Sequence, residues 1–257
     1  MVPFTCDLVI AYFKENLGWM KEFESFPFRT IYIYTKGKQP TLPFHRDTIK
    51  IITLENIGRC DHTYLYHIYT TYTTLPSVTI FTTGSTYLPH KHTHMRFIVP
   101  KVFETKDSVF RVVHEPDYKN KFKNFKLDTW RSTNKNNQEN VGKNSLQPSL
   151  LRPFGKWYDK LFHGIDIHYV AYGGVFAVSN KHIHNRKQEF FKQLLDEFPR
   201  HSNPEVGHFF ERAWLAIFHP IPKKCIFLEN ENPPPKNIRH VGGFTRKKLR
   251  RRRSRFT

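Results

Sequence analysis

The chain has 257 residues, and its 41 Lys and Arg side chains outnumber its 22 Asp and Glu side chains, which gives a formal net charge of +19. Hydrophobic residues make up 39% of the sequence, which is enough for a folded core and excludes a wholly disordered chain. Its three cysteines lie far apart without a CxxC pair, so a disulfide framework and a cysteine zinc site are excluded as well. No apolar run approaches the ~18 residues that a bilayer span needs, so we expect an intracellular protein, cytoplasmic or nuclear, with no membrane partner.

The first third of the chain alternates predicted strands with predicted helices. Short β-branched and aromatic runs predict strands at Asp7–Tyr12, Thr30–Thr35, Ile49–Leu54 and Val78–Thr82. Apolar residues at helical spacing predict a short helix near 17–23 and a longer one over 65–72, with Asp61 or Thr63 as its N-cap. This alternation indicates a parallel α/β sheet that resembles one nucleotide-binding half, although the sequence has neither GxGxxG nor a P-loop motif.

The remainder of the chain is less regular. Residues 131–149 are rich in Asn, Lys, Gln and Ser and are predicted to form a mobile loop. Strands are predicted at 165–171 and 175–178, and helices with apolar faces near 190–198 and 206–217. We therefore predict one α/β domain over 1–241, built on an open, mostly parallel Rossmann-like sheet with helices on both faces.

The C-terminal segment 242–257 carries a concentrated positive charge. Eight of its last twelve residues are Lys or Arg, and subtracting them from the net charge of +19 leaves +11 on the rest of the chain. Such a block is predicted to be disordered and to contact a polyanion or nucleic acid through residues 246–255, or to serve as a nuclear-import signal. A tail that only keeps the protein in solution is the alternative.

Four segments together resemble a known family. They are DLVIAYFKENLGW from Asp7, NIGRCDHTYLYHI from Asn56, YGGVFAVS from Tyr172 and ERAW from Glu211. These segments are similar to the domain of unknown function family 3431, found in fungi and some large viruses, and the resemblance spans about 7–218 apart from the Asn-rich loop. The chain departs from the family pattern at Tyr12-Phe13, where Arg-Tyr is expected, at Cys60, where Glu is expected, and at Thr83, where Gln is expected.

The element order of this family looks like that of the GT-A glycosyltransferases, and that likeness implies a function. It implies a nucleotide-sugar donor and a glycan acceptor, and in many such enzymes a DxD motif after the fourth strand holds a divalent metal. Here that place reads Thr82-Thr83-Gly84-Ser85, which has no carboxylate. We therefore expect a donor site without a DxD metal; a divalent metal as cofactor is the alternative.

Three residues are catalytic candidates. Arg59 and His62 follow the third strand at the start of a helix, where a phosphate ligand is expected in such sheets. The alternatives are that Arg59 pairs with Glu55 or Asp61 and that His62 is an ordinary helix residue. Glu211 is a candidate base for the acceptor hydroxyl, whereas Glu205, one and a half turns earlier, is interpreted as a solvated helix carboxylate.

Four further residues are candidates for substrate binding. Tyr12 ends the first strand and Glu15 follows it, where Glu15 could bind a base or ribose with Trp19 packed behind it. Gly173 and Gly174 open a strand and would allow the backbone to approach a ligand closely. A first-turn helix carboxylate and a plain tight turn are the respective alternatives. We expect these four to share one cleft with Arg59, His62 and Glu211.

A run of alternating histidines forms a weaker candidate metal site. On a strand, His90, His92 and His94 would share one face, and imidazoles suit zinc, nickel or iron. A chance cluster on a basic loop is the alternative.

Three functions therefore compete at this point. The first is a GT-A-like glycosyltransferase, the second a basic protein that binds nucleic acid or another polyanion without turnover, and the third a transferase that has lost its activity. The motifs at the strand ends favour the first function, and the basic tail favours the second.

Overall fold

The computed structural model describes residues 3–128 and 146–234, and its centre is a sheet of five strands in the order β3-β2-β1-β4-β7. The strands are β1 (Cys6–Tyr12), β2 (Thr30–Thr35), β3 (Ile49–Thr53), β4 (Val78–Thr83) and β7 (Phe176–Ser179). The first four run parallel, with Leu8 opposite Ile31 on β2 and Ile80 on β4, and β7 runs antiparallel to β4. The predicted open, mostly parallel sheet is confirmed.

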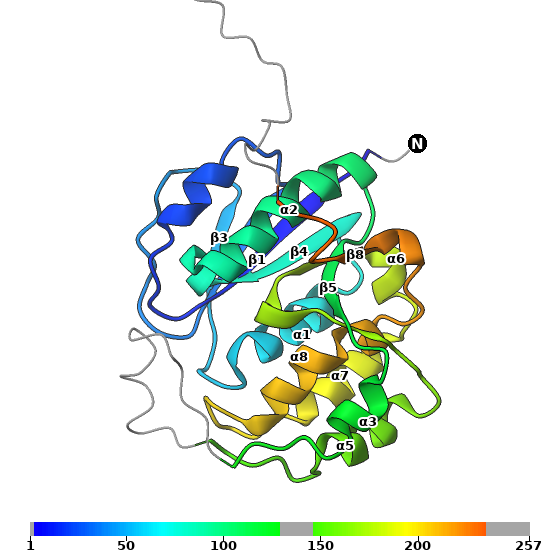
Figure 1. The fold of residues 1–257 in the computed structure, drawn as a ribbon. Coiled ribbons are helices and arrows are strands. Elements are labelled where there is room, and N and C mark those ends of the chain that lie inside the picture. The colour runs from blue at the N-terminus through cyan, green and yellow to red at the C-terminus, as the bar shows by residue number, and fades with distance from the viewer. Residues whose placement is uncertain (1–2, 129–145, 235–257) are drawn as a thin grey trace, which may run out of the picture.

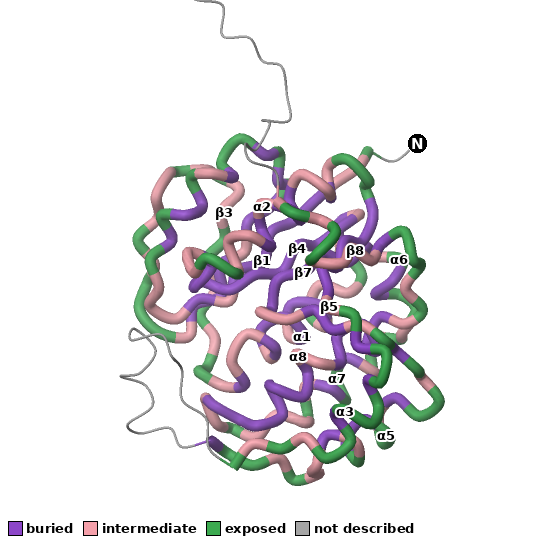
Figure 2. The backbone as a smooth tube through the Cα atoms, viewed as in Figure 1, coloured by how far each residue is buried: buried purple, intermediate pink, exposed green. Residues whose placement is uncertain are grey.

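Alternation along β1 divides the core into two layers. Leu8, Ile10 and Tyr12 point into one apolar cluster, and Val9 points into the other. Figure 1 shows α2 lying across one face of the sheet, with α1, α7 and α8 on the other, so helices cover both faces as predicted. The tube coloured by burial shows the central strands buried along their length, which is typical of a parallel sheet covered on both faces (Figure 2).

The helices and the remaining strands have the following bounds. The α-helices are α1 (Arg59–Thr71), α2 (Pro89–Thr105), α3 (Tyr118–Lys123), α5 (Phe154–Phe162), α6 (Asn180–Ile183), α7 (Gln188–Asp196) and α8 (Glu205–Ile217). The 3-10 helices are η1 (Gly18–Phe23), η2 (Gly84–Tyr87), η3 (Tyr172–Gly174) and η4 (Lys223–Cys225). A second, smaller sheet has the order β6-β5-β8, from β5 (Phe110–His114), β6 (Tyr169–Val170) and β8 (Ile226–Leu228).

Several elements differ from the sequence-based prediction. The smaller sheet and α2 were not predicted, and α1 begins at Arg59 after Gly58, so neither Asp61 nor Thr63 is its N-cap. Most of the Asn-rich segment 131–149 and the whole basic tail 242–257 lie outside the described residues. The described end of that loop is ordered: Leu146 is buried and Gln147 bridges to Pro204. None of the described helices combines the length and the apolar character of a membrane span.

Candidate functional site

The sheet order places the topological switch point, where open α/β sheets have their ligand crevice, between the carboxyl ends of β1 and β4. From β1 the chain moves outward to β2 and β3, and then returns to the other side of β1 as β4. The segments that follow these two strands, η1 after β1 and α2 after β4, both pack into the apolar cluster on one face of the sheet. Trp19 ties the loops after β1 and β4 together by donating its indole N–H to the carbonyl of Gly84 at 3.0 Å.

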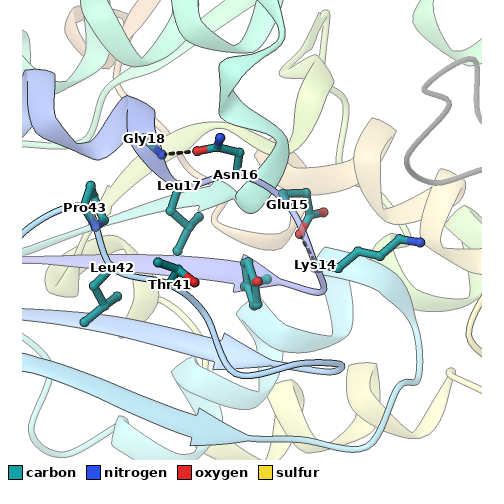
Figure 3. A pocket seen from close by; sticks show the side chains of 9 residues that line it. Lys14, Glu15, Asn16, Leu17, Gly18, Thr41, Leu42 and Pro43 are labelled. Carbon is teal, nitrogen blue, oxygen red and sulfur yellow. Dashed lines mark hydrogen bonds between the residues drawn. The ribbon is translucent and has the colours of Figure 1, made fainter.

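An open cavity of about 530 Å³ lies on the β1 side of this crevice. Its lining comes from the end of β1, the loop after it and the loop between β2 and β3 (Figure 3): Tyr12, Lys14, Glu15, Asn16, Leu17, Gly18, Thr41, Leu42 and Pro43. Apolar side chains such as Leu17 and Leu42 stand beside polar ones such as Asn16 and Thr41. Its volume and mixed lining suit a small organic ligand with polar substituents.

Glu15 closes the turn after β1 rather than capping a helix. Its Oε2 accepts hydrogen bonds from the backbone N–H groups of Phe13 at 2.8 Å and Lys14 at 3.0 Å. The same carboxylate lies against Gly84, where a Cβ would stand 2.7 Å from Oε2 and 3.2 Å from the Tyr12 ring. Tyr12, Glu15 and Gly84 thus meet where the two loops touch, and Gly84 is the residue that permits the close approach.

The loop before α1 brings Arg59 toward α8. Gly58 and Arg59 both have left-handed φ angles, of 61° and 55°, and for a non-glycine residue this conformation costs about 1 kcal/mol. Lys36, at the end of β2, donates to the carbonyls of Ile57 and Arg59 and so holds this loop. The Arg59 guanidinium lies 2.9 Å from Nε2 of His208 on α8, one turn before Glu211 on that helix.

Glu211 and the two glycines join the same cluster. Glu211 accepts a hydrogen bond from the Gly173 N–H at 3.0 Å, and Tyr64 on α1 donates its hydroxyl to the Gly174 carbonyl at 2.8 Å. A Cβ on Gly174 would lie 3.3 Å from the Cys60 sulfur, and the φ of 66° at Gly174 is one that other residues rarely adopt, so glycine suits the close approach of η3 to α1. Arg59, Gly173, Gly174 and Glu211 therefore lie near one another, whereas the cavity described above is lined by Tyr12 and Glu15 and by none of these four residues.

Lys91 connects this cluster with the end of β4. Its ammonium donates to the hydroxyls of Thr83 and Ser85, each at 3.1 Å. Its Cγ would lie 3.7 Å from a Cβ on Gly173. Burial lowers the pKa of Lys91, and Arg59 lowers it further, whereas Glu211 and Glu15 act in the opposite direction. Lys91 thus lies between the charged groups from the loop after β1, from α1 and from α8.

Asp61 adds a buried carboxyl group beside these charges. Burial, with the negative charge of Glu211 nearby, raises the pKa of Asp61 to about 7. Cys60 directs its thiol toward Asp61 Oδ2 at 3.5 Å, and burial raises the pKa of this thiol to about 12. Cys60 is therefore a neutral packing residue at physiological pH.

His62 points away from the cluster. Its ring stacks on Tyr66 and meets Phe198 edge-on, on the side of α1 away from Gly174. Burial lowers the pKa of His62 to about 4, with a further contribution from Lys36. A neutral imidazole packed between aromatic rings corresponds to the alternative interpretation, and the structure does not bring His62 together with Arg59 and Glu211.

The histidine run lies on α2, not on a strand, so His92 does not share a face with His90 and His94, which are four residues apart on one face of the helix. On a helix, residues two apart point in different directions. His92 pairs with Glu22 at 2.6 Å, and His94 pairs with Glu229 at 3.3 Å. His90 lies near Gly173: a Cβ added to Gly173 would stand 3.9 Å from Cδ2 of His90.

Another group of potential metal ligands occurs at the opposite edge of the sheet. Within the described ranges, Asp107, His182 and Cys225 place one ligand atom each within 4.8 Å of one another. Lys181 and Lys224 already donate to Asp107 Oδ2, at 2.8 and 3.0 Å, and hold the pKa of this carboxyl well below its usual range although burial opposes them. The carboxylate is thus neutralised by the protein itself.

Glu205 is a structural residue, so its interpretation as a solvated carboxylate was wrong. The side chain is fully buried and accepts hydrogen bonds from the N–H groups of Leu127 and Ser149, both at 2.8 Å. Arg152 lies 3.3 Å away and balances its charge. Glu205 therefore fastens both sides of the 129–145 segment to α8.

Sequence reasoning missed Lys91, Lys36 and the 41–43 side of the cavity. Lys91 was assigned to the histidine run, although Pro89 marks the first helical position and would have placed Lys91 in the first turn of a helix. Lys36 follows directly after a predicted strand, and a position near a strand end is what made Tyr12 a candidate. Nothing local in Thr41-Leu42-Pro43 indicates a binding surface.

These features define a class of protein: an open α/β domain with an open cavity beside the topological switch point of its parallel strands. The chain belongs to the family described as "Protein of unknown function (DUF3431)", whose model matches residues 8–231. The family membership indicated by the four sequence motifs is thereby confirmed. No curated protein matches the chain.

Proposed function

We propose that this protein is a GT-A-like glycosyltransferase that binds a nucleotide sugar in the crevice between β1 and β4. The observation that carries the proposal is the 530 Å³ cavity at the carboxyl end of β1, beside the switch point of the sheet. A nucleoside in the cavity would lie between the loop after β1 and residues 41–43. Its diphosphate would then extend toward the end of β4, where Lys91 and Arg59 gather.

The reaction assigns a role to Glu211. The bond between the sugar C1 and the leaving phosphate oxygen breaks, and both electrons stay on that oxygen. The acceptor hydroxyl oxygen forms the new bond to C1, and its proton passes to a carboxylate. Glu211 is held by the Gly173 N–H, and its side chain is 30% exposed, so it combines a fixed position with access to an acceptor.

A thermal-shift screen of nucleotide sugars, nucleosides and free sugars tests this proposal. We expect nucleotide sugars and nucleosides of one base to raise the melting temperature, because a ligand that binds only the folded state stabilises it. Thr41→Trp, at an exposed position in the cavity wall, should weaken this binding at least about tenfold. Thr73→Trp, at an exposed position outside the cavity, is the matched control. Equal binding by both variants would contradict the proposal.

A further inference from the structure

The place that a GT-A-like fold implies for a divalent metal does not fit one in this chain. At the end of β4 and just after it, Thr82, Thr83, Gly84 and Ser85 offer hydroxyl groups and no carboxylate. The carboxylate that lies against Gly84 is that of Glu15, whose Oε2 already accepts hydrogen bonds from the N–H groups of Phe13 and Lys14. Mg²⁺ and Mn²⁺ are held by carboxylate oxygens and by substrate phosphates. Two neutral hydroxyls that already accept hydrogen bonds from an ammonium group make a poor cage for such an ion.

A cation of the protein itself occupies this place. The Lys91 ammonium lies 3.1 Å from Thr83 Oγ1 and 3.1 Å from Ser85 Oγ, and these two oxygens lie 3.0 Å from each other. Thr86 fixes the turn by donating its hydroxyl to the Thr83 carbonyl at 2.7 Å. Both hydroxyl residues are buried, at 7% and 4% exposure. The ammonium is therefore held in one position by a rigid turn.

The charge on Lys91 is not balanced by a close carboxylate. Among residues 3–128 and 146–234, no Asp or Glu oxygen lies within 4.0 Å of its Nζ, and Glu211 and Glu15 act on it only from a greater distance. Arg59 contributes a second positive charge nearby. The hydrogen-bond partners of this half-buried ammonium are neutral. It can therefore form a charge-assisted hydrogen bond with an anionic ligand that enters the site.

We propose that Lys91 takes the place of the divalent metal and, with Arg59, neutralises the diphosphate of the donor, so that this site works without a metal ion. The inference rests on the proposed function and names the group that stabilises the leaving phosphate as the C1–O bond breaks. As the electron pair moves to that oxygen, negative charge develops next to the ammonium. A positive charge held in place there stabilises it in the transition state. A purely structural role, in which Lys91 only fastens the 83–85 turn, is the competing explanation.

Calorimetric titration of a nucleoside and its diphosphate, each with EDTA and with Mn²⁺, separates these explanations. We expect the diphosphate to bind more tightly than the nucleoside and equally well under both conditions. Lys91→Met should weaken diphosphate binding at least about tenfold and leave nucleoside binding unchanged, which corresponds to one charge-assisted hydrogen bond. Lys101→Met, on the same helix but paired with Glu104, is the control.

Each other outcome decides against one of the two proposals. If the nucleoside binds but the diphosphate needs Mn²⁺, or if Lys91→Met binds the diphosphate like the wild type, the role of Lys91 is wrong and the proposed function stands. If the wild-type protein binds no nucleoside, nucleotide or nucleotide sugar, the proposed function fails and this inference fails with it.

A second measurement does not depend on the folding of Lys91→Met. Reductive ¹³C-methylation labels the lysine side chains of the wild-type protein, and the Lys91 signal is the one missing from the spectrum of Lys91→Arg. Inorganic pyrophosphate added in EDTA should shift that signal and leave the Lys101 signal in place. An unmoved Lys91 signal at saturating pyrophosphate would overturn the proposal.

Discussion

Lys91 on α2 donates its ammonium to the hydroxyl of Thr83, the last residue of β4, at 3.1 Å. This contact joins the two halves of the crevice, because Thr83 precedes the Gly84 on which Tyr12 and Glu15 meet, while Lys91 also lies beside Gly173 and the charges of Arg59 and Glu211. The donor site that we propose therefore depends on the ends of β1 and β4 and on the helices that follow β3 and β4.

The buried carboxyl of Asp61 predicts a pH-dependent stability. Its pKa rises from 3.8 to about 7 on folding, so between these values the folded state holds a proton that the unfolded state has lost. Stability contributed by this group is present below pH 3.8 and falls as the pH rises to about 7.

Asp61→Asn should remove this effect. The free energy of unfolding of the variant should equal that of the wild type near pH 4 and exceed it by up to about 4 kcal/mol near pH 8. Urea unfolding across this range measures the difference. A difference that stays constant with pH would show that Asp61 titrates alike in both states.

Gly174→Ala should destabilise the protein through both its backbone angle and its neighbours. Gly174 has a φ of 66°, and a Cβ there would lie 3.3 Å from the Cys60 sulfur. Gly164 has a φ of 75° with nothing within 4 Å, so Gly164→Ala carries only the backbone cost of about 1 kcal/mol. We expect Gly174→Ala to lose roughly 1 kcal/mol more than this control in chemical denaturation. Equal losses would mean that η3 moves away from α1 freely.

Glu211→Gln tests the candidate base. The amide oxygen can still accept the hydrogen bond of the Gly173 N–H, so the fold and the binding of a nucleoside diphosphate should be retained within about twofold. Sugar transfer should fall roughly 10²- to 10⁴-fold, because the amide cannot take the acceptor proton. Glu189→Gln, at an exposed position on α7, is the control. Unchanged transfer by Glu211→Gln would assign the base to another residue.

Deletion of residues 242–257 tests the second proposed partner, a polyanion or nucleic acid. The deleted segment holds eight basic residues among the last twelve. The salt dependence of nucleic-acid binding should flatten, since fewer counterions are released, while nucleotide-sugar binding and the melting temperature should stay nearly unchanged. An unaltered salt slope would locate the nucleic-acid surface on the rest of the chain.

The parallel sheet was predictable because its signals are local. The apolar runs of β1, β2, β3 and β4 end in residues typical of turns. That pattern indicates the type of each element and the order of the elements along the chain. The position of the crevice was predictable in part, since Tyr12 ends β1 and Arg59 begins the helix that follows β3. The antiparallel course of β7 and the small sheet rest on pairings between distant segments, which no local pattern encodes.

The particular contacts of the site were not predictable for a related reason. The position of Lys91 depends on α2 returning its first turn to the hydroxyls of Thr83 and Ser85. His62 seemed equivalent to Arg59 in sequence, but the left-handed backbone of Arg59 turns its side chain to His208, whereas the His62 ring meets Phe198. Glu205 looked like a surface carboxylate because its partners, Leu127 and Ser149, are far away in sequence.

The central claim is that the donor binds between the loop after β1 and residues 41–43. Photolabelling with nucleotide sugars that carry an azido group on the base, followed by peptide mapping, tests it most directly. We predict labelled peptides from 13–18 and 41–43, with labelling suppressed by unmodified nucleoside diphosphate and reduced in Thr41→Trp. Labelling confined to the basic tail at 246–255, or labelling that excess nucleoside diphosphate does not suppress, would contradict the claim.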